Sequence, residues 1–470
     1  MHVCGGIKAM AINTVYPKLV VKNFGPFEYA EVELKPLTII IGRNSLGKSM
    51  LTYLLWSLMV TAPDLETLAQ VIDERKAENY AKAFLESVRG GRVDSEALRE
   101  LFLMHVKALP QALASGFKRI LEKTFATPVG ELVRKGAVKS IVRVEGKHGC
   151  FIEFAIEKSN VKALASNSIY DFIKRFKIVP SSPMPGYVEV RDVKGKFKSK
   201  LISMVSLRDV ISLIISLLVN YVISFYSPFF TIEEFIALLP DSRAGASRFL
   251  LRPYPSPEAL KGTLYPDEHF ARMYFMLSEK LARKEVEITY AKPLLEELGY
   301  TPEPVYEAGA YAIYVKMWND VRIPLVKAPS GVRESLTLTL ALTSKKAPYI
   351  VVVEEPEAHL HPRAQRLLAE LIAKVINNLG KTVIITTHSD YLVYSLSNMI
   401  AASSRKKIKE EAPISGIEAL SPAKVSVYLV KKQRSKVSLE KLEVSEEGIL
   451  EEEFAKIAEE LAEERAKILG

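Results

Sequence analysis

A phosphate-binding pattern lies near the start of the chain. Residues 39–49 read Ile-Ile-Ile-Gly-Arg-Asn-Ser-Leu-Gly-Lys-Ser, and their last eight residues fit the pattern G-x-x-x-x-G-K-[ST]. Glycines let backbone N–H groups turn inward around phosphate oxygens, and a helix that follows points its positive end at the same anion. Lys48 can reach the β and γ phosphates, and the Ser49 hydroxyl can bind Mg²⁺. The predicted phosphate cradle consists of Gly42, Arg43, Asn44, Ser45, Leu46, Gly47, Lys48 and Ser49.

A pair of acidic residues forms the second candidate. Residues 350–353 are apolar, and Glu354 and Glu355 follow them directly. In P-loop ATPases this position holds an acid associated with Mg²⁺ and then a glutamate that polarises the attacking water. Adjacent residues at a strand end point in different directions, so one can face the metal and the other the water. By itself the pair could be an acidic cap on an exposed turn. Together with the phosphate loop, it predicts Glu354 as a metal ligand and Glu355 as the catalytic base.

A histidine follows the next predicted strand. Residues 382–386 are all β-branched, and His388 comes directly after Thr387. If the two strands are parallel neighbours, His388 lies at the same sheet edge as Glu355. There it can contact the γ-phosphate or the attacking water. A lone histidine is more often structural, but this position favours a catalytic role.

Ser330 and Gly331 open a predicted helix just ahead of the acidic strand. Serine followed by glycine at a helix N-terminus makes a ready anion site. Considered alone, the pair would be interpreted as an ordinary serine N-cap.

The elements that must position these residues alternate between strand and helix, which implies a parallel sheet and an α/β fold. In the second half of the chain they are a helix at 330–342, a strand at 349–353, a helix at 362–379 and a strand at 382–386. Around the phosphate loop they are a strand at 37–41 and a buried helix at 50–59.

The rest of the chain suggests a divided ATPase core. We expect the core at 17–60 and 300–445, a mainly helical insertion with a β-hairpin and one or two core strands at 61–299, and a C-terminal helix at 446–470. The other expected elements are strands at 18–24, 27–34, 187–193, 235–239, 425–430 and 437–444, hairpins at 138–156 and 311–326, and helical stretches at 64–135 and 257–298.

Composition sets broad limits. The chain has 470 residues, of which 48% are hydrophobic. We therefore expect a folded chain with two or three structural units and not a disordered one. The net charge of +9 permits an acidic partner such as nucleic acid without establishing one. Glutamine is scarce while lysine, arginine and glutamate are abundant, which suggests a thermophilic source.

The cysteine content and the lack of a recognisable targeting signal predict a cytoplasmic protein. Cys4 and Cys150 are the only cysteines, as expected for two free thiols in a reducing compartment. Residues 1–14 lack the pattern of a signal peptide. Residues 210–232 carry no charge and are long enough to span a bilayer, but they contain several serines, an asparagine and a proline. We interpret them as a buried helix running into a strand, without stable membrane insertion.

In this order, the four motifs resemble the ABC-type ATPase heads of the SMC and OLD-like families. The run Glu-Glu-Pro-Glu-Ala-His-Leu-His-Pro at 354–362 looks like the OLD-like version, in which glutamate replaces the usual aspartate. Three further stretches fit: Asn-Phe-Gly-Pro-Phe at 23–27, the signature-like Ser-Gly-Val-Arg-Glu at 330–334, and Leu-Pro-Asp-Ser-Arg-Ala-Gly at 239–245, to which we assign no role. The resemblance covers about 18–60 and 230–445.

The resemblance implies a nucleotide-dependent dimer. In such heads two subunits sandwich two ATP molecules, and the signature motif of one faces the phosphate loop of the other. Ser330 and Gly331 would then contact ATP in trans, with ATP and Mg²⁺ as cofactors. His361 stands where the dimer-facing loop usually carries aspartate, and Phe24 is a candidate contact for adenine. OLD nucleases add a Toprim domain with metal-binding aspartates, yet residues 401–470 contain no aspartate, and the long coiled coil of SMC proteins is also missing.

Three functions remain open. The first is an ATP-driven dimerising switch that acts on DNA in repair or defence, for which the basic stretches 191–200 and 405–409 could neutralise phosphates. The second is an ATP-gated scaffold that acts through a separately encoded effector protein such as a nuclease. The third, the ATPase subunit of a membrane transporter, ranks last because the segment 49–353 is far longer than such subunits have.

Overall fold

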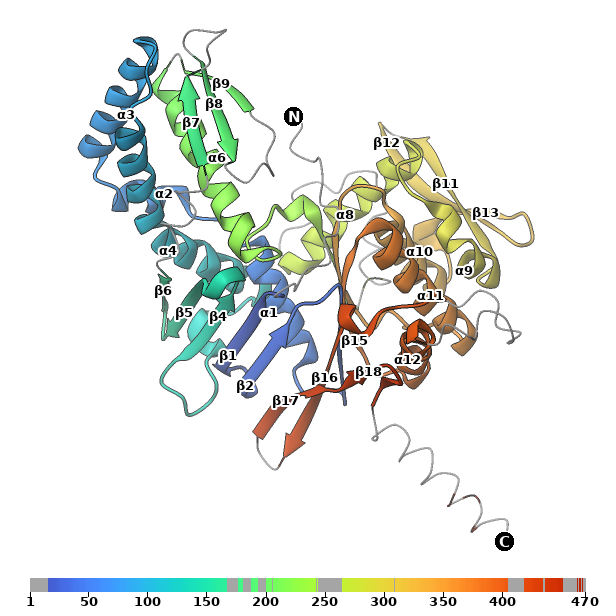
Figure 1. The fold of residues 1–470 in the computed structure, drawn as a ribbon. Coiled ribbons are helices and arrows are strands. Elements are labelled where there is room, and N and C mark those ends of the chain that lie inside the picture. The colour runs from blue at the N-terminus through green and yellow to red at the C-terminus, as the bar shows by residue number, and fades with distance from the viewer. Residues whose placement is uncertain are drawn as a thin grey trace. The chain divides into compact units, whose positions relative to one another are not determined.

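The computed structural model (Figure 1) describes residues 16–166, 176–180, 187–192, 200–204, 206–241, 243, 264–307, 309–404, 418–433, 436–450, 463, 465 and 467. The chain forms two compact units. Among the described residues, unit 1 comprises Pro26–Trp56 and those from Glu233 onward, and unit 2 comprises 16–25 and Ser57–Ile232. The insertion was expected at 61–299, but the described residues from 233 to 299 belong to unit 1 together with the expected ATPase core.

A parallel sheet forms the centre of unit 1. Its apolar strands carry buried side chains on both faces, which is typical of parallel strands covered on both sides. The parallel strands are, in spatial order, β10 (Ile236–Leu239), β14 (Ile350–Glu354), β15 (Thr382–Thr387), β3 (Leu37–Gly42) and β16 (Val425–Gln433). Next to β16 come the antiparallel β17 (Lys436–Leu442) and then β2 (Phe27–Glu33). The predicted α/β fold is confirmed.

The strand register brings three strand ends level. Glu354 at the end of β14 pairs with Thr386 of β15, and Thr386 pairs with Ile40 of β3. Ligands of open parallel sheets bind outside the carboxyl ends of the strands. The segments that follow β3, β14 and β15 therefore emerge at one sheet edge.

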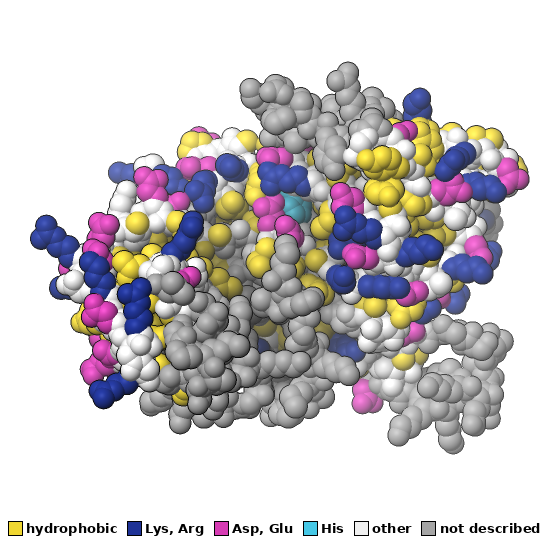
Figure 2. Space-filling view, turned by 90° about the horizontal axis from the view of Figure 1, so that it is seen from above, with side chains coloured by type: hydrophobic (Ala, Val, Ile, Leu, Met, Phe, Trp, Pro, Cys, Tyr) yellow, Lys and Arg dark blue, Asp and Glu magenta, His cyan; other side chains and the backbone are white. Residues whose placement is uncertain are grey.

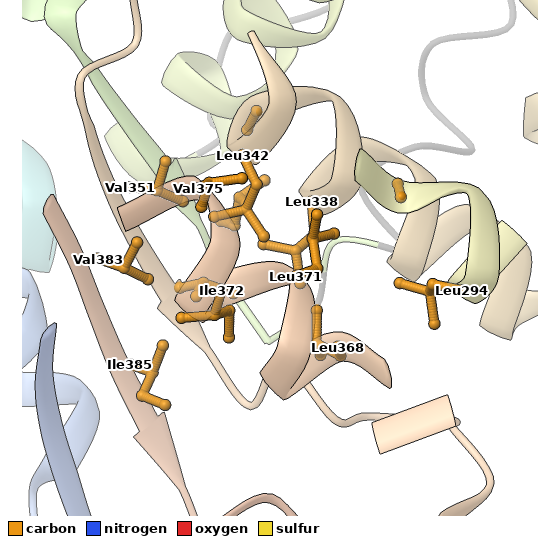
Figure 3. Close-up of a cluster of buried hydrophobic side chains, with 14 of the residues drawn as sticks. Leu294, Leu338, Leu342, Val351, Leu368, Leu371, Ile372, Val375, Val383 and Ile385 are labelled. Atoms are coloured by element: carbon orange, nitrogen blue, oxygen red, sulfur yellow. The ribbon is translucent and has the colours of Figure 1, made fainter. Parts of the chain in front are cut away.

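Helices cover this sheet through apolar contacts. Leu338 and Leu342 pack with Leu368, Ile372 and neighbouring strand residues in one buried cluster (Figure 3). Burying each such side chain contributes about 1.5–3 kcal/mol. The helices of unit 1 are α8 (Tyr265–Ala282), α9 (Lys292–Glu297), α10 (Ser330–Thr343), α11 (Pro362–Leu379) and α12 (Asp390–Ser404), while α1 (Lys48–Val60) begins in unit 1 and continues into unit 2.

Unit 1 also contains a small antiparallel sheet. It consists of β11 (Tyr300–Glu307), β12 (Ala310–Met317) and β13 (Arg322–Pro324). The hairpin expected at 311–326 forms β12 and β13. The sequence did not predict β11, because Pro302 and Pro304 interrupt it and proline is unfavourable in strands. Two short strands, β18 (Val444–Ser445) and β19 (Gly448–Ile449), pair with each other.

Unit 2 contains two antiparallel sheets and several helices. Aspartates at positions 64, 73 and 94 cap the N-termini of α2, α3 and α4, which explains where these helices begin. One sheet has the order β1 (Lys18–Phe24), β4 (Ser140–Glu145), β5 (Phe151–Glu157) and β6 (Asn160–Ala165), and the other has β7 (Phe176–Pro180), β8 (Tyr187–Asp192) and β9 (Lys200–Ser203). The helices are α2 (Leu65–Val71), α3 (Glu74–Arg89), α4 (Ser95–Phe125) and α6 (Leu207–Tyr226).

The uncharged stretch 210–232 forms α6 but no strand. After α6 ends at Tyr226, the chain turns at Ser227 and Pro228, and the N–H groups of Phe230 and Thr231 donate to the carbonyls of Leu58 and Met59. The expected strand was wrong, because the proline lacks an N–H for a strand ladder. Among the described helices, none has the length and apolarity needed to cross a bilayer.

Several expectations fall on residues that the structure does not describe. They are most of the C-terminal helix expected at 446–470, the basic stretch 405–409, and the basic stretch 191–200 apart from its first two residues and its last.

Candidate active site

The phosphate loop connects β3 to α1, and its glycines are dictated by close packing. Gly42 has φ +145°, and a Cβ there would lie 2.8 Å from the carbonyl oxygen of Val430. Gly47 has φ +98°, and a Cβ there would lie 2.6 Å from Cγ of Pro26. Only glycine fits both positions without displacing a neighbour.

The loop residues between these glycines face outward. The side chains of Arg43, Asn44 and Ser45 are exposed, and Leu46 is half-buried. Ser49, in the first turn of α1, is also exposed. The structure therefore brings all eight predicted cradle residues together at the N-terminus of a long helix, where an anion is favoured.

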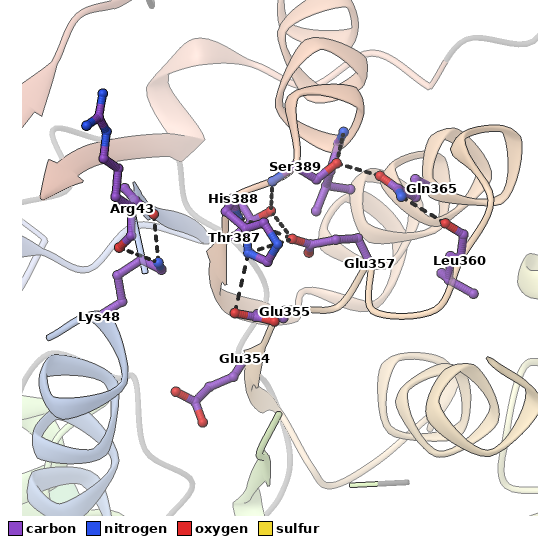
Figure 4. A network of polar contacts seen from close by, with 12 residues as sticks. Arg43, Lys48, Glu354, Glu355, Glu357, Leu360, Gln365, Thr387, His388 and Ser389 are labelled. Atoms are coloured by element: carbon purple, nitrogen blue, oxygen red, sulfur yellow. Dashed lines mark hydrogen bonds and ion pairs between the residues drawn. The ribbon is translucent and has the colours of Figure 1, made fainter. Parts of the chain in front are cut away.

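Lys48 is buried with its ammonium at the mouth of the loop. Its Nζ donates to the carbonyl oxygens of Gly42, at 2.7 Å, and Arg43, at 3.0 Å. Burial lowers the pKa of Lys48, and the nearby carboxylates of Glu355, Glu357 and Glu354 raise it. Figure 4 shows this ammonium on the side of the loop that faces the acidic residues.

Glu354 is a buried carboxylate whose hydroxyl neighbours, Ser49 and Tyr53, lie outside ordinary hydrogen-bond geometry. It ends β14 and is 1% exposed, and neither of its carboxylate oxygens has a hydrogen bond of ordinary length and angle. Burial raises its pKa, whereas the nearby hydroxyls of Ser49 and Tyr53 lower it. Mg²⁺ prefers oxygen ligands such as carboxylates. The oxygens of Glu354 and Ser49 therefore fit the predicted Mg²⁺ ligands.

Glu355 and His388 meet at the sheet edge. Glu355 adopts φ +45°, and its N–H donates to the carbonyl oxygen of Thr386 at 2.9 Å. Its Oε1 lies 3.4 Å from Nδ1 of His388, and the two side chains are 32% and 48% exposed. An accessible carboxylate beside an imidazole can accept a proton from a water molecule.

Glu357 was not predicted from the sequence, although it lies within the acidic run. Its buried Oε1 accepts a hydrogen bond from Oγ1 of Thr387 at 2.6 Å and from the N–H of His388 at 3.3 Å. It thereby ties the loop after β14 to the end of β15 and fixes the backbone that carries His388 (Figure 4). No local sequence pattern marks this contact, because Glu357 and Thr387 are 30 positions apart.

A second link lies behind the histidine. Oγ of Ser389 donates to Oε1 of Gln365 on α11, and Nε2 of Gln365 donates to the carbonyl oxygen of Leu360 at 2.9 Å. These bonds join the start of α12 to the loop before α11, so the residues around His388 rest on a rigid base.

Ser330 and Gly331 are the first two residues of α10, because Pro329 occupies the N-cap position. The alternative of an ordinary serine N-cap is therefore wrong. Both residues are partly exposed. A Cβ at Gly331 would lie 3.0 Å from the carbonyl oxygen of His359, so α10 begins in close contact with the loop that follows the acidic pair.

Two residues suggested by the family resemblance have structural roles. His361 is the N-cap of α11, and its Nδ1 accepts from the N–H of Arg363 at 3.4 Å. Phe24 is fully buried in unit 2, with its ring 6.0 Å from that of Phe125. The suggested contact between Phe24 and adenine was wrong, because no face of the ring is open to a ligand.

The phosphate loop and the acidic strand coincide with the two parts of a known family. Residues 10–89 and 268–393 match the family described as the AAA ATPase domain. These two segments are similar to the AAA ATPase domain family. The matched segments of this domain contain the phosphate loop, Glu354, Glu355, His388 and the first two residues of α10.

Among the solved structures with a partial likeness to this chain are three heads of SMC proteins. An SMC head bound to the C-winged helix domain of ScpA has 12% sequence identity and a TM-score of 0.46, and the match covers 92% of this chain and 98% of that chain. The SMC head domain from Thermotoga maritima has 11% identity and a TM-score of 0.37, with 91% of this chain and 98% of that chain covered. An Smc head with an extended coiled coil, bound to the C-terminal domain of ScpA derived from Pyrococcus furiosus, has 11% identity and a TM-score of 0.42, with 95% of this chain and 99% of that chain covered. These likenesses are too weak to indicate a function. No curated protein matches the chain.

Proposed function

We propose that the chain binds ATP and hydrolyses it in a Mg²⁺-dependent reaction at the carboxyl ends of β3, β14 and β15. The observation that carries this proposal is the convergence of Lys48, the orphaned carboxylate of Glu354, and the contact between Glu355 and His388 at one sheet edge. The family match supports the nucleotide and the reaction class.

The phosphate loop holds the substrate in this mechanism. Backbone N–H groups from Arg43 to Ser49 and the ammonium of Lys48 bind the β and γ phosphates. Ser49 and Glu354 would hold Mg²⁺, and this ion would supply positive charge near the phosphate oxygens. The ion would give the buried Glu354 carboxylate a charged partner in addition to the nearby hydroxyls of Ser49 and Tyr53.

Glu355 acts on the attacking water. Its carboxylate accepts a proton as the water oxygen bonds to the γ-phosphorus, while the bond from that phosphorus to the β,γ-bridging oxygen breaks and ADP leaves with the electron pair. His388 beside it orients the water or contacts the γ-phosphate. Glu357 holds the backbone of His388, so the two groups stay in place during the reaction. Preorganised groups of this kind need little rearrangement in the transition state.

We further propose that two copies of the chain sandwich two ATP molecules, with Ser330 and Gly331 of each copy touching the nucleotide of the other. The N-terminus of α10 suits this role because its first residues are partly exposed and a helix N-terminus attracts phosphate. Light scattering with saturating ATP, Mg²⁺ and a hydrolysis-deficient variant tests the dimer. A mass that remains that of a monomer contradicts it.

Phosphate release by the purified chain tests the hydrolysis itself. We expect release from ATP with Mg²⁺ and almost none with a chelator. Equal release under both conditions would contradict the assigned metal role, and no release at saturating ATP and Mg²⁺ would contradict hydrolysis.

The partner of this switch is proposed to be DNA, in repair or defence. The net charge of +9 supports an acidic partner, although Figure 2 shows basic and acidic side chains interspersed over the described part of one face. Non-specific DNA affinity falls steeply with salt. If neither duplex nor single-stranded DNA binds the wild type at low salt, the better proposal is an ATP-gated scaffold for a separately encoded effector protein.

A further inference from the structure

Arg243 is a fully buried arginine beside the acidic strand. It is 0% exposed and is one of the largest fully buried side chains among the described residues. It follows β10, the parallel neighbour of β14, and lies in the stretch 239–245, for which the sequence alone indicated no role. A buried guanidinium is costly unless its N–H groups are matched, so its partners reveal what it holds.

The guanidinium donates to the backbone of both acidic residues. Nη1 donates to the carbonyl oxygen of Glu354 at 2.7 Å, and Nη2 donates to that of Glu355 at 2.9 Å. Nη1 also reaches the carbonyl oxygen of Pro240 at 3.1 Å. Two adjacent carbonyls of the acidic pair are therefore held by one rigid, planar group.

The same guanidinium also holds α10. Nη2 lies 3.0 Å from Oε2 of Glu334, whose side chain is buried, and Nε donates to the carbonyl oxygen of Glu334 at 3.4 Å. Glu334 lies one turn after Ser330 and Gly331. Its other oxygen, Oε1, lies 3.9 Å from Nε2 of His359, in the loop that Gly331 contacts.

These bonds act on a strained part of the backbone. Glu355 has φ +45°, a conformation that costs a non-glycine residue on the order of 1 kcal/mol or more. The bond from Arg243 to the carbonyl of Glu355 and the bond from the N–H of Glu355 to Thr386 grip the residue from two sides. The direction of the Glu355 carboxylate depends on this backbone.

We propose that Arg243 is a positioning residue that fixes the backbone of Glu354 and Glu355 and couples it to the N-terminal turn of α10. An ion pair that served the core alone would need only Glu334, whereas this guanidinium also binds two carbonyls of the acidic pair. Burial lowers the pKa of Arg243 and Glu334 raises it, consistent with a charge that is retained because it is bound from several sides. The inference rests on the proposed hydrolysis, because it assigns Arg243 to the same site.

Arg243→Lys tests the proposal. Lysine keeps the charge but cannot span both carbonyls and Glu334 with a planar fork. We expect kcat for ATP to fall about 10- to 100-fold, because Glu355 is misplaced, while KM changes less than about threefold, because the phosphate loop is intact. Arg322→Lys is the matched control in unit 1: its ion pair to Glu303 lies on the β11–β13 sheet, and its kcat should equal that of the wild type.

A double variant separates positioning from general stability. If Arg243 acts through Glu355, then Arg243→Lys should change turnover less than about twofold when Glu355 is already Gln. If both losses multiply in the double variant, or if folded Arg243→Lys keeps wild-type kcat, the proposal is overturned.

Should Arg243→Lys not fold, Glu334→Gln replaces it, since the amide keeps one acceptor and removes the charge. A smaller loss of kcat at unchanged KM is expected, and again no further loss beside Glu355→Gln. An unchanged kcat in Glu334→Gln overturns the coupling to α10. The proposed function is tested separately, because hydrolysis by the wild type and its loss in Glu355→Gln do not depend on Arg243.

Discussion

At the amino ends of β14 and β15 a buried lysine donates to two carbonyl oxygens, whereas at their carboxyl ends the buried carboxylate of Glu354 has hydroxyl neighbours only outside ordinary hydrogen-bond geometry. Lys381 is 2% exposed, and its Nζ donates to the carbonyl oxygens of Lys346, at 3.1 Å, and Pro348. Glu354 is equally buried, but its oxygens lack comparable partners. Lys381 precedes β15 and Glu354 ends β14, two neighbouring strands of one sheet. We therefore attribute the difference in their hydrogen bonding to different roles of the two ends of the sheet.

The comparison separates a structural charge from a functional one. Native proteins nearly always pair their buried polar groups, and exceptions concentrate at working sites. Lys381 spans the segments that lead into β14 and β15 and needs nothing from outside. We propose that a bound cation completes the environment of Glu354. We therefore expect the sheet edge at Lys381 to affect the stability of the fold and the sheet edge at Glu354 to affect nucleotide binding and hydrolysis.

The largest expected effect is on ATP affinity, and it is tested by replacing the buried lysine at each end of the sheet, Lys48 or Lys381. Lys48→Ala should reduce ATP affinity roughly 100-fold, because a charged donor to the phosphates is lost. Lys381→Met should leave that affinity unchanged. Titration with a fluorescent ATP analogue measures both. A similar loss in both variants would show that the two ends do not differ in function.

Glu355→Gln should have the next largest effect. Turnover should fall by roughly 100-fold, which is the usual scale for losing a general base, while ATP affinity stays within about threefold because the phosphate loop is intact. Phosphate release and analogue binding measure the two quantities. Full turnover in this variant would remove Glu355 from the mechanism.

The smallest expected effect is on the pH dependence of the free energy of unfolding, through Lys381. Burial lowers the pKa of Lys381 to about 7, well below that of lysine in the unfolded chain. Between these two pKa values the unfolded chain binds more protons, so the free energy of unfolding should rise with pH, by at most about 1.4 kcal/mol per pH unit. Below the lower pKa the full burial penalty of the charge remains.

Lys381→Met should flatten this rise. Denaturant unfolding of the wild type and the variant across the range from about pH 7 to about pH 9 provides the measurement. Identical pH slopes in the two proteins would mean that Lys381 does not titrate as its surroundings indicate.

The sequence predicted the helices and strands around the acidic pair well where the signals are local. Helix α11 has its predicted bounds, because Pro362 fits the first helical position and Gly380 the left-handed residue after the end. The acidic strand and the strand before His388 were found within about two residues, because runs of buried apolar residues mark parallel strands.

The parts that the sequence could not predict depend on contacts between distant residues. Arg243 meets Glu354 across 111 positions, and Glu357 meets Thr387 across 30. No local pattern specifies such bonds. The same holds for β11, which pairs with β12 despite two prolines because the pairing outweighs the unfavourable local preference.

The most direct test of the account is the thermal midpoint of Glu354→Gln, measured without ligand and with ATP and Mg²⁺ and compared with the wild type. The variant removes an unmatched buried charge, so without ligand it should melt at a higher temperature than the wild type. It also removes a metal ligand, so ATP and Mg²⁺ should raise its midpoint much less. A variant that melts lower than the wild type without ligand and gains as much from ATP and Mg²⁺ would contradict the assignment of Glu354 as a functional charge.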